Sequence, residues 1–418
     1  MLPMIPEIVS YITRREGRKF RRLNNVFSDD LVKAEGGGNI SPALYVHIPF
    51  CRSLCPFCCF NRYLFDADLA RRYFIDLKKE LDLYIGRGFR FSSVYFGGGT
   101  PTVLMDELLS FIEYLRAGLS IAEISLETTP RELTAANIAL LKQAGIKRLS
   151  IGVQSFEDKV LKTMGRVNGP AAEVKRRLLS AEGQFDTLNV DFVFNFPGQT
   201  VEQFKADVAA FKELGIDQAT FYPLMASPHK KDALERRFNR VDNSRERRFY
   251  DVILAELYRG GYNASTAWCF SRGERMIDEY IIGSDDYIGI GAGSVSIIDG
   301  KFLVNTFSLD RYHELTDARR FPVAGWRRLS ERERYRYYLL TKLFGLKLDR
   351  EAFRRRFGAD VGDKLRWELA FLKTSGLVTG EDNTLRVSEK GMYPVSVMMR
   401  EFFAALNTLR EEYIGKQI

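Results

Sequence analysis

Four of the five cysteines in this 418-residue chain lie within nine residues of one another. Three of them, Cys51, Cys55 and Cys58, follow the spacing C-x₃-C-x₂-C within the stretch LYVHIPFCRSLCPFCCFN. Proteins hold iron–sulfur clusters through cysteine thiolates, so three thiolates on one short loop can ligate three irons of a [4Fe-4S] cluster and leave the fourth open to a small molecule. The spacing therefore predicts a cluster with one open iron.

Other cysteine chemistries fit the sequence less well. Five cysteines in 418 residues leave one unpaired and are too sparse for a disulfide framework. A structural zinc site usually has two separated ligand pairs, whereas His229, His313 and Cys269 each stand alone. We interpret Cys59, which adjoins Cys58, as a packing thiol or a thiol beside the cluster. The alternative is a role in substrate chemistry, which requires a lowered pKa.

The composition is that of a soluble globular protein, with 45% hydrophobic and 28% charged residues. The chain is long enough for two or three domains. It has no apolar run of about 18 residues or more, as a membrane span requires, and its N-terminus places apolar residues before basic ones, the reverse of a secretory signal. We therefore expect a cytoplasmic protein in a reducing, anaerobic environment.

The net charge of +8 and the pI near 9.1 allow for an anionic partner. Much of the positive charge lies in short runs, such as 354–356 and 245–248, which on helices are more often solvated faces than nucleic-acid surfaces. No helix-turn-helix, zinc-finger or ribonucleoprotein motif accompanies these runs. We therefore predict no nucleic-acid partner.

Short β-rich runs alternate with amphipathic helical stretches after residue 43. Strands are predicted at 44–48, 93–96, 123–127, 148–152, 188–194 and 218–222, and helices at 68–85, 105–115, 134–143, within 157–183, and at 201–214. In the first helix Leu69, Tyr73, Leu77 and Leu81 recur every fourth residue, a stripe that would cover a sheet. Strands joined by helices favour a parallel sheet with right-handed crossovers, so the fold class is α/β, a partial (β/α)₆ barrel. Functional side chains are then expected at the carboxyl ends of the strands.

The pattern divides the chain into four parts. Residues 1–43 are an N-terminal extension that ends in the glycine-rich loop GGGNISP, and residues 44–225 are the partial barrel. Residues 226–328 are an extension that completes the active site, and residues 329–418 a helical, winged-helix-like C-terminal domain. The third part contains basic helical segments and the glycine-rich turn DDYIGIGAG. The fourth contains a predicted hairpin within 377–387.

Further polar and glycine-rich segments follow the predicted strands on the side of the cysteine loop. The run GGGTPT at 97–102 lets the backbone approach a ligand closely, and its free NH and CO groups could bind an amino-acid head group. Glu127, Gln154 and Asp191 could form a ring around a polar ligand, although each alone fits a solvated loop residue or a helix cap. Arg166 could pair with a carboxylate through its planar guanidinium, or lie on a helix surface.

Taken together, these motifs resemble the radical S-adenosylmethionine superfamily. The resemblance rests on YVHIPFC with C-x₃-C-x₂-C, on GGGTPT, LETTPRELT, KRLSIGVQSF, MGRV, VDFVFNFPGQT and DDYIGIGAGS, and more weakly on LKTSGLV and LRVSEKG. Within the superfamily they are most similar to the branch typified by the oxygen-independent coproporphyrinogen III oxidase. The motifs are spread over nearly the whole chain.

The resemblance implies that Cys51, Cys55 and Cys58 ligate the cluster and that S-adenosylmethionine chelates the open iron. An electron from the cluster, delivered by a reductant such as flavodoxin or ferredoxin, would cleave the sulfonium and release a 5′-deoxyadenosyl radical. Similar motifs assign Tyr45, Gly98 and Glu127 to this first S-adenosylmethionine. They assign Phe57, Gly99, Thr100, Gln154, Arg166 and Asp191 to a second one. The GIGAG segment at 289–293, with Gly291 and Ala292 as cofactor-binding residues, would close the pocket from the side.

His47 resembles the family's histidine in the first strand. With Tyr45 it is a candidate catalytic residue that could shuttle protons, and a structural histidine is the alternative.

Three functions compete within the family: propionate decarboxylation, C-methylation of an aromatic substrate by class C methyltransferases, and heme binding by a chaperone. The chain departs from the decarboxylase in the adjoining cysteines of CPFCCFN, in Asn168 in place of a histidine, and in Asn195 in place of a glycine. These departures favour a class C-type C-methyltransferase acting on a planar substrate, either a menaquinone-type quinone or a tetrapyrrole. We expect a monomer, which would contact an anionic membrane surface if its substrate is a quinone.

Overall fold

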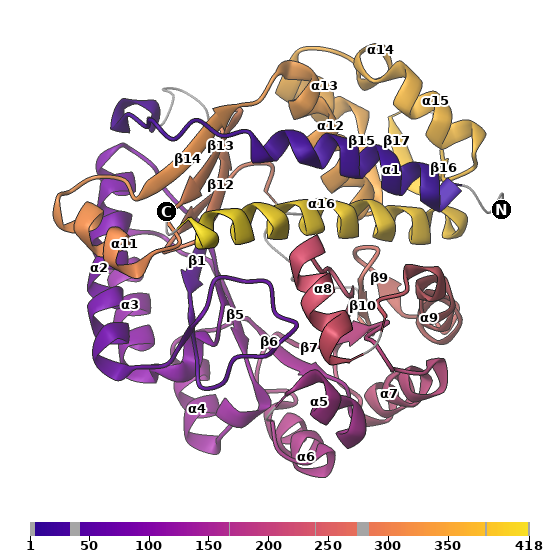
Figure 1. Ribbon diagram of the computed structural model, residues 1–418, viewed down its shortest axis with the longest axis horizontal. Coiled ribbons are helices and arrows are strands. Elements are labelled where there is room, and N and C mark those ends of the chain that lie inside the picture. The colour runs from indigo at the N-terminus through magenta and orange to yellow at the C-terminus, as the bar shows by residue number, and fades with distance from the viewer. Residues whose placement is uncertain are drawn as a thin grey trace.

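The computed structural model describes residues 5–33, 42–166, 168–238, 240–273, 284–380 and 383–416. Within these residues one 12-stranded sheet runs in the order β14-β13-β12-β11-β1-β4-β5-β6-β7-β8-β10-β9. The helices between residues 67 and 214 lie around its outer side (Figure 1). None of the described helices combines the length and apolarity that crossing a bilayer demands.

The parallel strands predicted from the sequence are confirmed. They are β1 (Ala43–Ile48), β4 (Ser93–Gly98), β5 (Glu123–Thr128), β6 (Arg148–Gln154), β7 (Thr187–Phe194) and β8 (Gln218–Pro223), each parallel to the next. The connecting helices are α2 (Ala67–Gly86), α3 (Met105–Gly118), α4 (Ala135–Gln143), α5 (Asp158–Met164), α6 (Ala171–Ala181) and α7 (Val201–Leu214). The central part of the protein is therefore the predicted partial barrel.

Helix α2 shows how local sequence determines one of these elements. Its first turn is capped by Asp66, whose side chain accepts a hydrogen bond from the Leu69 amide. Tyr73, Leu77 and Leu81 are buried, as their spacing predicted. The buried face also includes Glu80, a carboxylate that the apolar stripe did not indicate.

Strands from residues 263–328 extend both edges of this sheet. Strand β11 (Tyr287–Ile290) lies parallel to β1, and β12 (Val295–Ile298), β13 (Lys301–Asn305) and β14 (Val323–Arg328) follow it antiparallel. At the other edge β10 (Cys269–Ser271) pairs antiparallel with β8 and with β9 (Asn263–Ala264). The prediction of a turn over the whole of 285–293 was wrong for 287–290, because Gly289 allows the backbone of β12 to pass close to it.

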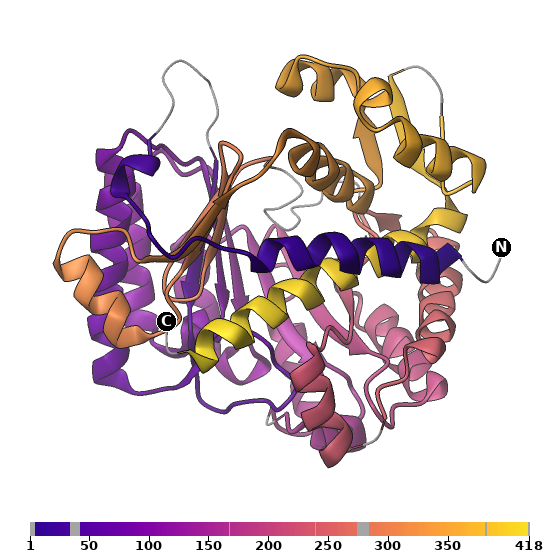
Figure 2. The ribbon, with the colours of Figure 1, turned by 45° about the horizontal axis from the view of Figure 1, so that its top comes forward.

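The C-terminal part contains a small sheet and several helices. Its elements are α12 (Glu331–Phe344), β15 (Lys347–Asp349), α13 (Arg350–Phe357), α14 (Val361–Lys364), α15 (Arg366–Thr374), β16 (Val378–Thr379), β17 (Thr384–Val387) and α16 (Glu389–Gly415). The predicted hairpin is present as β16 and β17, which pair antiparallel in a three-stranded sheet with β15. Helix α16 leaves this unit and crosses the molecule (Figure 2).

The N-terminal helix α1 (Ile5–Gly17) packs along α16, as both ribbon views show (Figures 1 and 2). Ser10 and Arg14 of α1 donate hydrogen bonds to the Glu401 carboxylate at 2.8 and 3.0 Å. The two ends of the chain are therefore joined through this pair of helices. The predicted glycine-rich loop that ends the N-terminal extension lies outside the described residues, except for its last residue.

A buried ionic cluster attaches α16 to the rest of the protein. The Arg400 guanidinium lies 2.6 Å from Glu246 of α9 (Glu246–Ile253) and 2.7 Å from Glu401, and all three side chains are less than 9% exposed. Burial raises the pKa of Glu246, and the neighbouring Arg400 opposes that shift. The arginine therefore favours the charged form of both buried carboxylates, against the effect of burial.

Replacing Arg400 by Met should lower the free energy of unfolding by about 3–5 kcal/mol, because removing one member of a buried ionic cluster leaves uncompensated charge. Urea denaturation followed by circular dichroism measures the change. Arg386→Met, which removes an exposed arginine, is the control and should change stability by less than about 0.5 kcal/mol. Equal stability of the two variants would contradict the role of Arg400.

Candidate active site

The cysteine loop follows β1 and is closed at its base by two short strands. Strand β2 (Phe50–Cys51) pairs in parallel with β3 (Tyr63–Leu64), and the Phe65 amide donates to Cys51 O at 2.9 Å. Within the loop the Cys58 amide donates to Cys55 O at 3.3 Å. Cys51, Cys55 and Cys58 all line one cavity of about 300 Å³. The structure therefore brings the predicted ligands together at the carboxyl end of the first strand.

The donors around these sulfurs fit an iron–sulfur cluster. Thr100 Oγ1 lies 3.7 Å from Cys51 Sγ, and Arg166 Nη1 lies 3.4 Å from Cys55 Sγ. Hydrogen bonds and positive charge near cysteine sulfurs stabilise the thiolate form that a cluster needs. Three soft sulfur ligands on one loop match iron–sulfur chemistry better than a site for a hard cation.

Cys59 has different surroundings from the triad. Its thiol donates to Met225 O at 3.4 Å, and burial raises its pKa to about 12. A substrate-reactive thiol requires the opposite shift. The geometry therefore supports the interpretation of Cys59 as a packing thiol.

The glycine run after β4 packs directly against the cysteine loop. The Gly99 amide donates to Ile48 O and the Thr100 amide to Phe50 O, both at 2.8 Å. A Cβ atom on Gly99 would lie 2.6 Å from Phe50 O, so the close approach requires glycine. These amides are not free to bind a ligand, contrary to our expectation. The run positions the cysteine loop while Gly98, Gly99 and Thr100 line the cavity.

Glu127 and Asp191 both line the cavity, as predicted, although Asp191 lies within β7 and not at its end. Glu127 accepts hydrogen bonds from Tyr95 Oη at 2.9 Å and from the Gly98 amide at 3.2 Å. Burial and the nearby Asp191 raise the pKa of Glu127 to about 7. Asp191 accepts from Ser150 and Asn189, and burial raises its pKa as well.

A buried arginine near these carboxylates was not anticipated. Arg148, at the start of β6, is fully buried, and its Nε donates to Gln218 Oε1 at 2.9 Å. Its positive charge lowers the pKa of both Glu127 and Asp191, opposing the effect of burial. The alternation of residues along one strand gives no sign that Arg148 lies near Glu127 and Asp191, because the three residues come from three separate strands.

Gln154 and Arg166 also line the cavity. Gln154 has a φ of 77° beside the register shift between β6 and β7, an uncommon conformation for a non-glycine residue. Arg166 donates to Gly152 O, whereas its buried Nε has no hydrogen-bond partner among the described residues. The Nε–H of Arg166 is therefore available to donate a hydrogen bond, as the predicted pairing of Arg166 with a ligand carboxylate requires.

His47 lies behind the cavity wall and is buried. Its Nε2 is 2.9 Å from Asn61 O, and its Nδ1 is 3.0 Å from Tyr45 Oη. A carbonyl oxygen only accepts, so Nε2 carries the proton and Nδ1 accepts from the tyrosine. Burial lowers the pKa of His47 to about 4 and keeps it neutral. Tyr45 lines the cavity and His47 does not. The geometry therefore favours the structural alternative for His47, in which the histidine orients the Tyr45 hydroxyl.

The segment after β11 is hydrogen-bonded to two side chains of helix α2. The Gly291 amide donates to Glu80 Oε2 and the Ala292 amide to Tyr73 Oη, both at 2.8 Å. Gly293, Ser294 and Val295 line the cavity, whereas Gly291 and Ala292 lie behind it. The prediction placed Gly291 and Ala292 at the cofactor, whereas the residues that can reach it from the cavity wall are Gly293, Ser294 and Val295.

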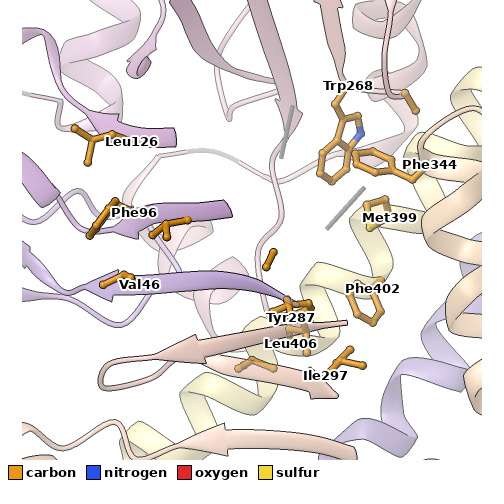
Figure 3. Packing of buried hydrophobic residues seen from close by; sticks show 14 of the residues in the cluster. Val46, Phe96, Leu126, Trp268, Tyr287, Ile297, Phe344, Met399, Phe402 and Leu406 are labelled. Carbon is orange, nitrogen blue, oxygen red and sulfur yellow. The ribbon is translucent and has the colours of Figure 1, made fainter. Parts of the chain in front are cut away.

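The far wall of the cavity comes from residues that we did not predict. Helix α16 contributes Met399, Phe402, Phe403, Leu406, Asn407 and Arg410, and other elements contribute Tyr222, Trp268, Tyr287 and Tyr337. Figure 3 shows Met399, Phe402 and Leu406 on the helix, with Trp268 and Tyr287 on either side. The α16 residues recur at intervals of three and four, so helical periodicity was the signal available in the sequence.

Comparisons with known proteins match this chain to one protein family and to several characterised relatives. Residues 45–211 match the family described as the Radical SAM superfamily. The chain is 25% identical over 362 residues to heme chaperone HemW of Bacillus subtilis (strain 168), covering 83% of this chain and 95% of that protein. It is 26% identical over 392 residues to anaerobilin synthase of Escherichia coli O157:H7, covering 90% and 86%. It is 27% identical over 379 residues to oxygen-independent coproporphyrinogen III oxidase of Salmonella typhimurium (strain LT2), covering 84% and 81%.

A solved structure extends the likeness in fold. The structure of coproporphyrinogen III oxidase (HemN) from Escherichia coli superposes with a TM-score of 0.77 at 23% identity, over 91% of this chain and 94% of that one. The shared fold therefore includes the C-terminal part as well as the barrel.

Replacing Cys55 by Ala should abolish cluster assembly, because two thiolates of the loop would remain. Cys59→Ala is the matched control and should retain iron and acid-labile sulfide, since its thiol binds backbone carbonyls. Both are measured after anaerobic reconstitution, together with absorbance near 400 nm. A full cluster in Cys55→Ala, or none in Cys59→Ala, would reverse these assignments.

The pKa of about 7 at Glu127 predicts pH-dependent binding of cationic S-adenosylmethionine. The carboxyl is mostly protonated at pH 6 and mostly charged at pH 8, so binding should strengthen by up to about tenfold as the pH rises between them. Equilibrium dialysis on reconstituted protein measures it. Glu127→Gln is neutral throughout and should lose this dependence. A variant with the pH profile of the wild type would argue against Glu127 as the titrating group.

Proposed function

We propose that this chain, a member of the radical SAM superfamily through residues 45–211 and of the HemN and HemW branch, is an enzyme acting on a tetrapyrrole. The observation that carries the proposal is the cavity, which runs from the three cysteines to an aromatic wall on α16. Two of its sequence relatives are named for heme and for coproporphyrinogen III, and both compounds are tetrapyrroles.

The two ends of the cavity suit different parts of a reaction. The cysteine end carries the thiols, Glu127, Asp191 and Arg166, which can hold polar and charged groups. The α16 end presents aromatic and aliphatic side chains, including Trp268 and Phe402, which can pack on the faces of a flat apolar ring. A large planar substrate would thus lie between the apolar wall on α16 and the cysteine loop.

When bound, the cluster and S-adenosylmethionine would supply the one-electron chemistry that begins the reaction. The chain's own residues hold and orient these groups. The three cysteines would ligate the cluster, while Glu127, fixed by Tyr95 and Gly98, provides a negative charge for a cationic cofactor. The apolar wall on α16 would keep water away from a reactive species.

C-methylation remains our proposal for the reaction itself. Its support is that the six residues assigned by resemblance to a second S-adenosylmethionine all line the same cavity. They are Phe57, Gly99, Thr100, Gln154, Arg166 and Asp191. Propionate decarboxylation and heme binding by a chaperone stay as alternatives, since relatives named oxygen-independent coproporphyrinogen III oxidase and heme chaperone match most of the chain. The menaquinone-type substrate has less support than the tetrapyrrole.

Anaerobic turnover with a chemical reductant, S-adenosylmethionine and heme or coproporphyrinogen III should separate these reactions. Methylation yields S-adenosylhomocysteine and 5′-deoxyadenosine in comparable amounts, together with a tetrapyrrole in which a methyl group has replaced one hydrogen. Decarboxylation yields 5′-deoxyadenosine and carbon dioxide without S-adenosylhomocysteine. Stoichiometric heme binding without either product would favour a chaperone. Turnover of a naphthoquinone and of no tetrapyrrole would contradict the proposal.

A further inference from the structure

We infer that Arg410 is the residue that selects the substrate by its charge, by pairing with a carboxylate on the periphery of the planar ring. The inference rests on the proposed function and deepens it, because it names the chemical group that the site recognises. Arg410 is the last member of the α16 stripe that lines the cavity. It lies where that helix meets the cysteine loop.

The guanidinium of Arg410 is held in place by neutral groups. Its Nη1 donates to Asn407 Oδ1 at 2.7 Å, and its Cζ lies 5.0 Å from the centre of the Phe60 ring. No carboxylate of the described residues forms an ion pair with it, and its buried Nε has no partner among them. The cation is therefore positioned but not neutralised, which leaves it available to an anionic ligand.

Asn407 is itself fixed so that its oxygen must face the arginine. The Asn407 side chain is buried, and its Nδ2 donates to Met225 O at 2.8 Å. A carbonyl can only accept, so the amide nitrogen is assigned to Met225 and the amide oxygen to Arg410. This arrangement restricts the orientation of the planar Arg410 guanidinium. A guanidinium held in one orientation suits bidentate binding of a carboxylate.

Other cavity arginines have different tasks. Arg52 forms an ion pair with Glu132 at 2.8 Å, and Arg62 and Arg166 donate to backbone carbonyls of Cys58 and Gly152. Arg131 is exposed at the rim, where water solvates its charge. Arg410 alone of these five adjoins the aromatic wall.

The wall and the arginine together describe an amphiphilic ligand. From Met399 to Arg410 the stripe rises by roughly 16 Å along the helix axis. Its first members are apolar and its last two are polar. A planar ring with carboxylate side chains matches this change from apolar to polar residues along the helix. A quinone with a hydrocarbon tail would leave the guanidinium unpaired and desolvated. Arg410 would thus favour an acidic ring over a neutral one.

The test compares protoporphyrin IX with its dimethyl ester, which keeps the ring and removes both charges. Dissociation constants are measured by fluorescence titration of the full-length reconstituted protein. The wild type should bind the diacid about 10- to 100-fold more tightly than the ester, as expected for a charged hydrogen-bonded pair. Arg410→Met should lose this preference and bind the ester within twofold of the wild type. Arg410→Lys should recover part of it, because a lysine keeps the charge but not the fork.

Arg131→Met is the matched control, since it removes the same charge from the cavity rim and should change neither constant more than twofold. Thermal unfolding within 2 °C of the wild type checks that each variant folds. Equal binding of diacid and ester by the wild type, or an equal loss in Arg131→Met, overturns the role of Arg410 and leaves the tetrapyrrole proposal standing. Failure of the wild type to bind either porphyrin overturns both.

Discussion

The site depends on a backbone contact between two neighbouring loops. Gly99 and Thr100 donate to carbonyls of the segment that leads into the cysteine loop, and the absence of a Cβ on Gly99 permits the approach. This contact places Cys51 beside the Thr100 hydroxyl and brings the ends of β1 and β4 to one edge of the cavity. A side chain at position 99 would separate the loops, and the geometry of the thiols would change with them.

Buried charge is the second constraint, and in two places a buried arginine lies beside buried carboxylates. Arg148 lies near Glu127 and Asp191, and Arg400 lies between Glu246 and Glu401. Isolated charges in such positions are costly, so these residues must assemble together or not at all. The first group shapes the polar end of the cavity, and the second attaches the helix that forms its apolar end.

The local patterns of the sequence predicted the barrel and much of the site. Alternating β-rich and amphipathic segments identified β1 and β4 to β8, since each pattern follows from burial on one or both faces. Short motifs identified Cys51, Glu127 and Asp191 as residues of the site, although Asp191 lies inside β7 rather than at a strand end. Local patterns do not specify long-range pairing, such as Cys269 with Thr220 at the sheet edge. The prediction for 329–418 was only a helical, winged-helix-like domain, and it did not identify α16 as a cavity wall. The helix also packs against α1, and apolar residues on several of its faces conceal which one meets the cavity.

The apolar wall of the cavity comes from Glu389–Gly415, far along the chain from the cysteine loop. The cavity therefore exists only when these two distant segments are folded against the same barrel. Loosening of the helix would open the cavity to solvent without any change in the cysteine loop itself.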